Sequence, residues 1–282
     1  MLKLNKLLYF LTPVYFSIKD YFVKNIGYHS ASVSFYFLMS LIPLLFFIIH
    51  TTSLIAYNHI KQVIEYLYIL FPEQVYNFVN LIVDISMKNK SFGVISLILS
   101  IYFSKDFFFS LQDAINFTFE DRKIEAKKKR LVVILSLPFL TFLIILFILI
   151  QLIFMFIINF FKDFSIFSFI AEYITLIQKI SLIFEFIAVF FLMFSIYYFL
   201  LPFNNLSKYQ IGLVSSFITI LIQIIKYIFN LYLSYVSHIN SVYVAAGGIF
   251  AFLIWIKLNF DVILIGSRIL FYIDNQNLPS SK

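Results

Sequence analysis

Six apolar runs, each about as long as a membrane-crossing helix, fill most of this chain of 282 residues. A helix needs about 20 mostly apolar residues to cross the hydrocarbon core of a bilayer. Four of the runs also carry ionisable side chains near their middle, where an unpaired charge is costly. The chain is therefore predicted to be all-α, a polytopic membrane bundle of six transmembrane helices, at about residues 32–56, 92–109, 131–161, 174–201, 211–236 and 242–273.

The composition and the distribution of charge agree with a membrane protein. Hydrophobic residues make up 62% of the chain and charged residues 12%, against roughly 45–50% and about 25% in soluble domains. The net charge of +7 follows from topology, because most lysines and arginines lie on the side that would hold both termini. By the positive-inside rule we expect a multi-pass protein of a bacterial inner membrane with both termini cytoplasmic.

A run of four basic residues lies on the predicted cytoplasmic side, at Lys127, Lys128, Lys129 and Arg130. We expect these side chains to contact anionic lipid headgroups. The expected partners are therefore membrane lipids, including anionic headgroups, and not nucleic acid. Oligomeric state is not predicted.

The segments outside the spans are short and mostly amphipathic. Residues 1–27 are predicted to form one or two interfacial helices on the cytoplasmic leaflet, with Thr12-Pro13 as a helix start inside the segment. Residues 57–90 suggest two short helices on the outer face, and Gln112–Arg130 a helical extension of the second span. Residues 28–273 then form one transmembrane domain, and residues 274–282 form a cytoplasmic tail.

Four ionisable side chains in the last three spans are the main functional candidates. They are Glu185 in the fourth span, Lys226 in the fifth, and Lys257 and Asp261 in the sixth. Charges inside a membrane mark substrate or ion pathways when they are not structural pairs. The four charges sum to zero and lie on hairpin neighbours, so one hypothesis is that they meet as a group near mid-membrane; the alternative is that they form separate structural pairs.

The fifth span carries a polar stripe at helical spacing. Two of its members, Gln223 and Asn230, join the predicted substrate or ion pathway. The stripe has two possible interpretations, close packing against a neighbouring helix or the lining of a wet cavity. Its members are Gly212, Ser215, Ser216, Thr219, Gln223, Lys226, Tyr227, Asn230, Ser234 and Ser237.

Other charged residues near the spans have simpler explanations. Lys257 and Asp261 can neutralise each other within one helix, since they are four residues apart. Arg268 is predicted to extend from the helix end toward the headgroups. Lys105 and Asp106 are secondary candidates; being adjacent, they are expected to project apart without pairing, and Lys105 to reach the headgroups.

The residues give little support to an enzyme. There is no cysteine, the four histidines have no metal-ligand spacing, and no glycine-rich phosphate loop occurs. We therefore expect no catalytic residues, no metal and no cofactor.

Several short motifs follow one another in a specific order along nearly the whole chain. They are Ala31–Tyr36 with Ser40–Leu45, Ser91–Gly93, Leu111–Asn116, Leu201-Pro202 with Gly212, Leu231–Ser234, and Tyr243, Trp255 and Gly266. In these motifs the chain resembles the YihY/BrkB family of bacterial inner-membrane proteins. It departs from the family at Tyr243-Val244, where Tyr-Gly is usual, and at Gly266-Ser267-Arg268, where Gly-Ala-Glu is common.

The resemblance implies six transmembrane helices with cytoplasmic termini, and a lipid or amphiphile transporter as the activity. An older ribonuclease label of the family finds no support in these residues. The first hypothesis is therefore a transporter or flippase-like protein for a lipid or other amphiphilic envelope compound. The alternative is a membrane scaffold whose buried charges only fix the packing of the helices.

Overall fold

The computed structural model describes residues 2–55, 80, 84, 92–120, 174–202, 205–236 and 241–276. Within these ranges the chain forms helices and no strands, which confirms the all-α prediction. The helices are α1 (Leu2–Val23), α2 (Ile26–Ile55), α5 (Phe92–Thr118), α7 (Ile174–Leu200), α8 (Lys208–Val236) and α9 (Ser241–Gln276). The predicted third span, the outer helices of residues 57–90 apart from helical Asn80 and Asp84, and the basic run Lys127–Arg130 lie outside the described residues.

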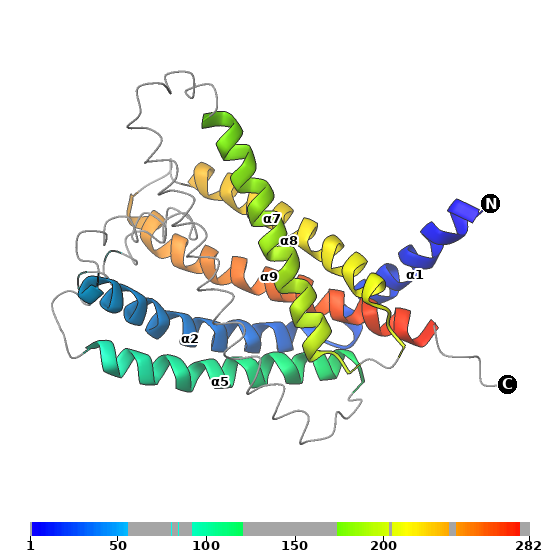
Figure 1. Cartoon of the computed structure of the whole chain (residues 1–282), viewed down its shortest axis with the longest axis horizontal. Coiled ribbons are helices and arrows are strands. Elements are labelled where there is room, and N and C mark those ends of the chain that lie inside the picture. The colour runs from blue at the N-terminus through cyan, green and yellow to red at the C-terminus, as the bar shows by residue number, and fades with distance from the viewer. Residues whose placement is uncertain are drawn as a thin grey trace.

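Helix α9 lies at the centre of the described bundle (Figure 1). Helices α2 and α5 run antiparallel beside each other, since Ser32 contacts Ser110 at 3.2 Å and Lys24 contacts Glu120 at 2.7 Å. Helices α7 and α8 form a hairpin on the other side of α9 (Figure 1). The C-terminal ends of α1, α5 and α9 lie at the same end of the bundle (Figure 1).

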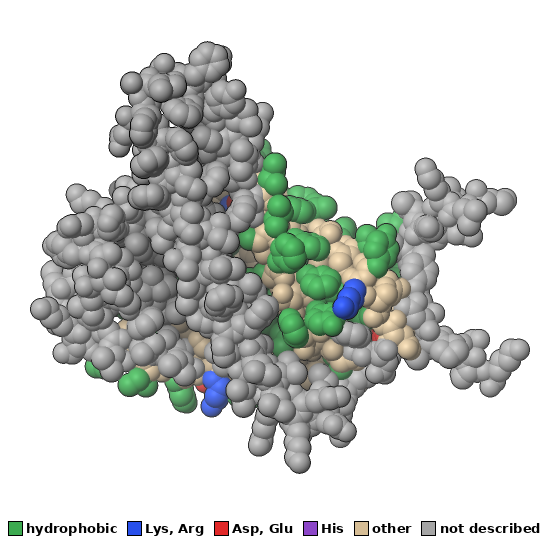
Figure 2. All heavy atoms as spheres, in the orientation of Figure 1, with side chains coloured by type: hydrophobic (Ala, Val, Ile, Leu, Met, Phe, Trp, Pro, Cys, Tyr) green, Lys and Arg blue, Asp and Glu red, His purple; other side chains and the backbone are tan. Residues whose placement is uncertain are grey.

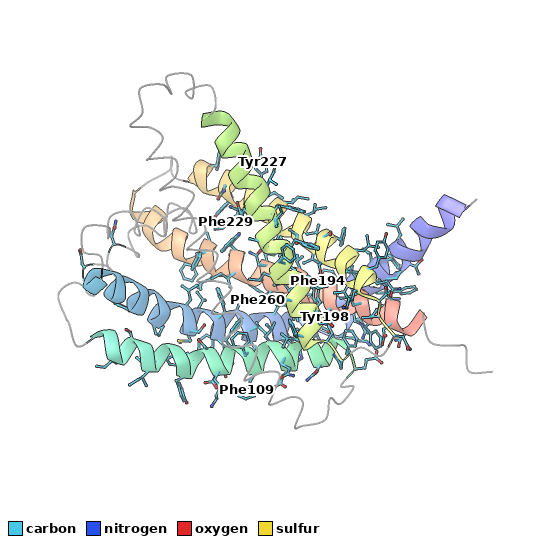
Figure 3. All side chains as sticks on the ribbon, viewed as in Figure 1. Phe109, Phe194, Tyr198, Tyr227, Phe229 and Phe260 are labelled. Atoms are coloured by element: carbon cyan, nitrogen blue, oxygen red, sulfur yellow. The ribbon has the colours of Figure 1, made fainter. Side chains whose placement is uncertain are left out.

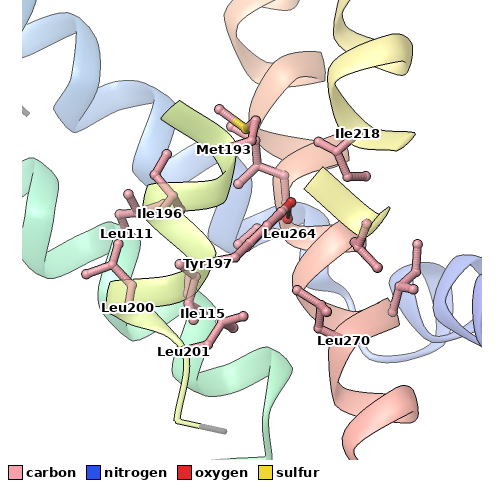
Figure 4. Packing of buried hydrophobic residues seen from close by; sticks show 14 of the residues in the cluster. Leu111, Ile115, Met193, Ile196, Tyr197, Leu200, Leu201, Ile218, Leu264 and Leu270 are labelled. Atoms are coloured by element: carbon pink, nitrogen blue, oxygen red, sulfur yellow. Dashed lines mark hydrogen bonds between the residues drawn. The ribbon is translucent and has the colours of Figure 1, made fainter. Parts of the chain in front are cut away.

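The core takes side chains from α2, α5, α7, α8 and α9, and at Gly266 of α9 side chains of α7 and α8 come close to the helix backbone. A Cβ atom at this position would overlap the Tyr197 hydroxyl of α7 and come within 2.6 Å of Cγ1 of Ile218 on α8. The Tyr197 side chain is fully buried and donates a hydrogen bond to the Ile263 carbonyl at 2.8 Å. Figure 4 shows Tyr197 beside Leu264, between α7 and α9. Glycine is thus required here by space, because three helices share one position.

Aromatic side chains fill the contact between the α2–α5 pair and α9. The Phe260 ring of α9 packs against Phe37 of α2 and Phe107 of α5, with centroid distances of 5.5 Å and 5.9 Å. Figure 3 shows Phe260 on this inner side of α9. Edge-on arrangements of this kind contribute about 0.5–1.5 kcal/mol per pair beyond the area they bury.

Helix α1 leaves the bundle and projects beyond it (Figure 1). Its helical structure continues through Pro13, so the predicted helix start at Thr12-Pro13 is wrong. A proline removes one intrahelical hydrogen bond and need not end a helix when the residues on both sides favour one. The Leu11, Tyr15, Ile18 and Phe22 side chains, spaced as one helix face, are all exposed.

The helix bounds differ from the predicted spans mainly in length. Helix α2 begins at Ile26 and α8 at Lys208, both earlier than predicted, and α9 continues to Gln276. Helix α5 continues past its predicted end to Thr118, as a helical extension should, but stops well before residue 130. Hydropathy locates the apolar centre of a helix and not its polar ends, which accounts for these differences.

Two helical stretches of the described chain are long and apolar enough to cross a membrane, Lys208–Tyr232 and Phe250–Asn275. A shorter apolar stretch covers Glu185–Leu200. On the face shown in Figure 2, the described side chains at the surface are mainly hydrophobic. Exposed apolar surface is typical of helices that face lipid or another protein.

We predict that Gly266→Ala destabilises the bundle, because the new methyl group overlaps Tyr197 and Ile218. Overpacking of this kind costs about 1–3 kcal/mol. The measurement is the thermal unfolding midpoint of the purified protein in detergent. Gly212→Ala is the matched control, since the nearest atom to its added Cβ would be 4.0 Å away, on Phe194. Equal midpoints for the two variants would contradict the proposed three-helix contact.

Candidate functional site: paired charges inside the bundle

Glu185 of α7 and Lys226 of α8 form an ion pair between two adjacent helices. Lys226 Nζ lies 2.5 Å from Glu185 Oε1, and the Gln223 amide donates to the same oxygen at 3.5 Å. The Lys226 side chain is 35% exposed and that of Glu185 is 24% exposed. Lys226 therefore lies within a helical stretch long enough to cross a membrane and Glu185 at the start of the shorter apolar stretch, yet the pair is not sealed inside the bundle.

Exposed apolar side chains lie close to this pair in sequence on both helices. They are Ile183 and Ile187, each two residues from Glu185 on α7, and Ile224 and Tyr227, close to Lys226 on α8. Figure 3 labels Tyr227 on α8. The pair is thus partly exposed on two helices that also carry exposed apolar side chains.

The polar stripe of α8 divides into two parts with different roles. Ser215 and Thr219 are fully buried and donate to backbone carbonyls one turn earlier, each at 2.8 Å. This part follows the packing interpretation, with its polar groups satisfied inside the helix. Gln223 and Lys226 belong to the other part and reach Glu185. Asn230, the third predicted pathway residue of α8, is exposed.

Lys257 and Asp261 of α9 pair within their helix, at the spacing that predicts such a pair. Lys257 Nζ lies 2.8 Å and 3.1 Å from the two Asp261 carboxylate oxygens. Ser30 of α2 donates a short hydrogen bond to Asp261, and the Tyr21 hydroxyl of α1 lies 3.5 Å from Lys257 Nζ. Three helices thus converge on the pair. Asp261 is nearly enclosed, whereas the Lys257 side chain is 40% exposed.

The four predicted charges therefore form two separate pairs. Within the described part of the chain, the ion pairs join Glu185 to Lys226 and Lys257 to Asp261, and no ion pair links one to the other. The first pair joins α7 to α8, and the second lies on α9 beneath α1 and α2. Each pair is neutral by itself, which removes most of the cost of placing charge in an apolar environment.

Arg268 is buried, and the prediction that it extends to the headgroups is wrong. Its side chain is 2% exposed and donates two hydrogen bonds to Asp20 of α1, at 2.8 Å and 2.5 Å. It also donates to Glu120 at 2.9 Å and to the Thr118 carbonyl at 2.7 Å. Tyr272 donates to the same Asp20 oxygen at 2.7 Å. We call Asp20, Lys24, Glu120, Arg268 and Tyr272 the Arg268 cluster.

The Arg268 cluster joins three helix ends and is close to neutral. Lys24 lies 2.7 Å from Glu120 and 3.6 Å from Asp20, so two cations face two carboxylates. Hydrogen bonds from Lys24 and Arg268 hold the pKa of Glu120 below its usual range. Burial alone would raise the pKa of Asp20, but hydrogen bonds from Tyr272 and Arg268 lower it. Both carboxylates are therefore kept ionised.

One residue of this cluster and one residue next to it in sequence adopt a left-handed backbone conformation. Asn25, between α1 and α2, and Glu120, just after α5, both have φ of 55°. Asparagine tolerates this region, whereas glutamate normally avoids it by about 1–2 kcal/mol. The bonds from Lys24 and Arg268 to the Glu120 carboxylate offset that cost, and this left-handed residue follows the end of α5 at Thr118.

The sequence carries one signal for the Arg268 cluster, the arginine of Gly266-Ser267-Arg268 within an apolar run. A cation inside a helix bundle requires partners of opposite charge. Asp20 and Glu120 are those partners, but they are far away in sequence, and only the folded chain brings them to Arg268.

The remaining predicted residues have minor roles in the structure. Lys105 Nζ lies 4.0 Å from Asp106 and 5.6 Å from the Tyr102 ring centre. The expectation that Lys105 and Asp106 do not pair is thus wrong, although an exposed contact at this distance contributes little. Lys127, Lys128, Lys129 and Arg130 lie outside the described residues. Among the residues that are described, no three histidine or carboxylate side chains are grouped to hold a metal.

An all-helical bundle with apolar stretches of membrane-crossing length, and with ion pairs inside them, is that of a helical membrane protein. Residues 18–282 match the protein family described as Virulence factor BrkB, and the chain belongs to this family. This match confirms the resemblance that the sequence motifs indicate. No curated protein and no solved structure matches the chain significantly.

We predict that Arg268→Met destabilises the protein by about 3 kcal/mol, near the lower end for breaking a buried charge pair. The substitution keeps much of the side-chain volume but leaves Asp20 without its guanidinium partner. The measurement is the thermal unfolding midpoint in detergent at neutral pH. Lys105→Met is the control, with an expected change within about 0.5 kcal/mol. A midpoint for Arg268→Met as high as that of the control would show that the cluster does not hold the helix ends together.

Proposed function

We propose that this protein is a multi-pass transporter or flippase-like protein of the bacterial inner membrane that moves a lipid or another amphiphilic envelope compound. The observation that carries the proposal is the partly exposed Glu185–Lys226 pair within helices α7 and α8. In this proposal six helices span the membrane, both termini are cytoplasmic, and Lys127–Arg130 contact anionic headgroups of the inner leaflet. The positions of α1 and of the end of α9 at the same end of the bundle support the common side of the termini (Figure 1).

The mechanism rests on exchange of partners at Lys226. In the resting state Glu185 neutralises the ammonium, so neither charge is left alone in hydrocarbon. An anionic headgroup that enters between lipid and protein can take the place of the carboxylate at Lys226, while its acyl chains stay among the exposed apolar side chains. Gln223 donates to Glu185 and holds the displaced carboxylate. The headgroup thus meets a polar position part way across the bilayer.

The second candidate function is a scaffold without transport. It is favoured by the pairing of Glu185 with Lys226 and of Lys257 with Asp261, because charges that serve only packing should be fully compensated. In this case the pairs fix which helix faces meet. We infer no catalytic role in either case, and no nucleic-acid partner.

Substitutions at Glu185 and Lys226 distinguish the transporter from the scaffold. We predict that Lys226→Met lowers the rate of lipid transfer about tenfold or more, since hydrogen bonds to a charged group contribute about 1.5–3 kcal/mol. The double variant Glu185→Lys with Lys226→Glu restores the ion pair and the fold but moves the ammonium to α7, so it should stay slow. The measurement follows dithionite quenching of fluorescent phosphatidylglycerol in vesicles that contain the purified full-length chain.

The controls make a failure interpretable. Lys105→Met, which removes an exposed lysine on α5, should transfer lipid at the wild-type rate. Full recovery of transfer in the double variant would favour a pair that only supports the fold. Wild-type protein that transfers no more lipid than protein-free vesicles, with or without a pH gradient, would contradict transport of this lipid class and leave the scaffold as the better account.

A further inference from the structure

The exposed apolar face of α9 ends at the Lys257–Asp261 pair. Phe250, Leu253, Ile254 and Leu258 are exposed and share one side of the helix at helical spacing. Lys257 lies on the same side, one turn after Leu253 and Ile254. One turn further, Asp261 is covered by Ser30 of α2. The lipid-facing surface therefore leads along α9 directly to a charged group.

The corner between α1 and α2 covers this end of the apolar face. The Tyr21 hydroxyl lies 3.5 Å from Lys257 Nζ, and the Ser30 hydroxyl donates to Asp261 while its oxygen also lies 2.9 Å from the Gly27 carbonyl oxygen. Gly27 leaves the necessary space, since a Cβ there would come within 2.8 Å of the Tyr21 hydroxyl and 4.0 Å of Lys257 Nζ. An ammonium, two hydroxyls and an apolar track thus meet at one point.

We propose that this corner is a binding site for one glycerophospholipid, with its phosphate at Lys257 and Tyr21 and an acyl chain along Phe250, Ile254 and Leu258. The side chains match the two halves of such a molecule. The Lys257 side chain is 40% exposed, so its ammonium can donate to a phosphate oxygen while it stays close to Asp261. Asp261 balances the lysine, so the empty site carries no net charge.

The site is separate from the Glu185–Lys226 pair and does not depend on transport. It is built by α1, α2 and α9, whereas the other pair lies between α7 and α8. A lipid held here would pack on α1 and α2 at the same time and so stabilise the attachment of α1 to the bundle. Lipid is therefore expected to bind at this corner even if the protein does not transport lipid.

The test is native mass spectrometry of the full-length chain, purified in mild detergent and then given phosphatidylglycerol. Lys257→Met alone would leave Asp261 unpaired, so the decisive variant combines Lys257→Met with Asp261→Asn, which keeps Ser30 a partner. We expect about tenfold weaker lipid affinity than in wild type, obtained by titrating phosphatidylglycerol, which corresponds to about 1.4 kcal/mol. Tyr21→Phe, which removes only the hydroxyl, should give an intermediate loss, and Lys105→Met none.

Two further measurements complete the test. Glycerophosphoglycerol, the same headgroup without acyl chains, should not displace the lipid, because the apolar face of α9 contributes to binding. Wild-type protein that loses its lipid as readily as the double variant would overturn the proposal. So would equal occupancy in Lys105→Met and the double variant with both below wild type, because lipid would then bind any exposed lysine. Circular dichroism of each variant separates loss of binding from loss of fold.

Discussion

The requirement that every charge inside an apolar bundle has a partner governs the arrangement of these helices. A single buried cation or carboxylate is costly in such an environment, and removing one partner of a buried pair is strongly destabilising. Arg268 shows the consequence most clearly, because it takes carboxylates from two other segments, Asp20 and Glu120. The ends of α1, α5 and α9 are thereby held at one end of the bundle, and a glutamate backbone is held in a conformation that it normally avoids.

Close packing at Gly266 sets the other half of the arrangement. Because Tyr197 and Ile218 both contact this position, α7 and α8 approach the same part of α9. Further along these two helices, Glu185 and Lys226 meet at their common edge and remain partly exposed. The core and the candidate site are thus connected: the glycine fixes the helix crossing, and the crossing brings an ammonium to a carboxylate on the neighbouring helix.

Hydropathy and residue spacing were sufficient to predict the described helices, their centres and the α9 pair, because each depends on residues close in sequence. Lys257 and Asp261 are four residues apart, so their contact follows from the helix itself. The partner of Glu185 was not fixed in this way, since depth in the membrane does not say which face a side chain occupies. Arg268 was misinterpreted for the same reason, because Asp20 lies 248 positions away along the chain. The continuous helix through Pro13 shows that a single proline is also a weaker signal than the helical preference of the residues around it.

The accessibility of position 226 tests most directly whether the α7–α8 pair is an open site. The chain contains no cysteine, so single-cysteine variants need no other change. Lys226→Cys and Ser215→Cys are compared in lipid vesicles with a thiol reagent that partitions into the bilayer, because position 226 is proposed to face lipid and Ser215 is a fully buried position of the same helix. We predict that the thiol at position 226 is modified and the one at position 215 is not. Equal protection of both positions would contradict an open site and would indicate an enclosed pair that serves only to hold the helices together.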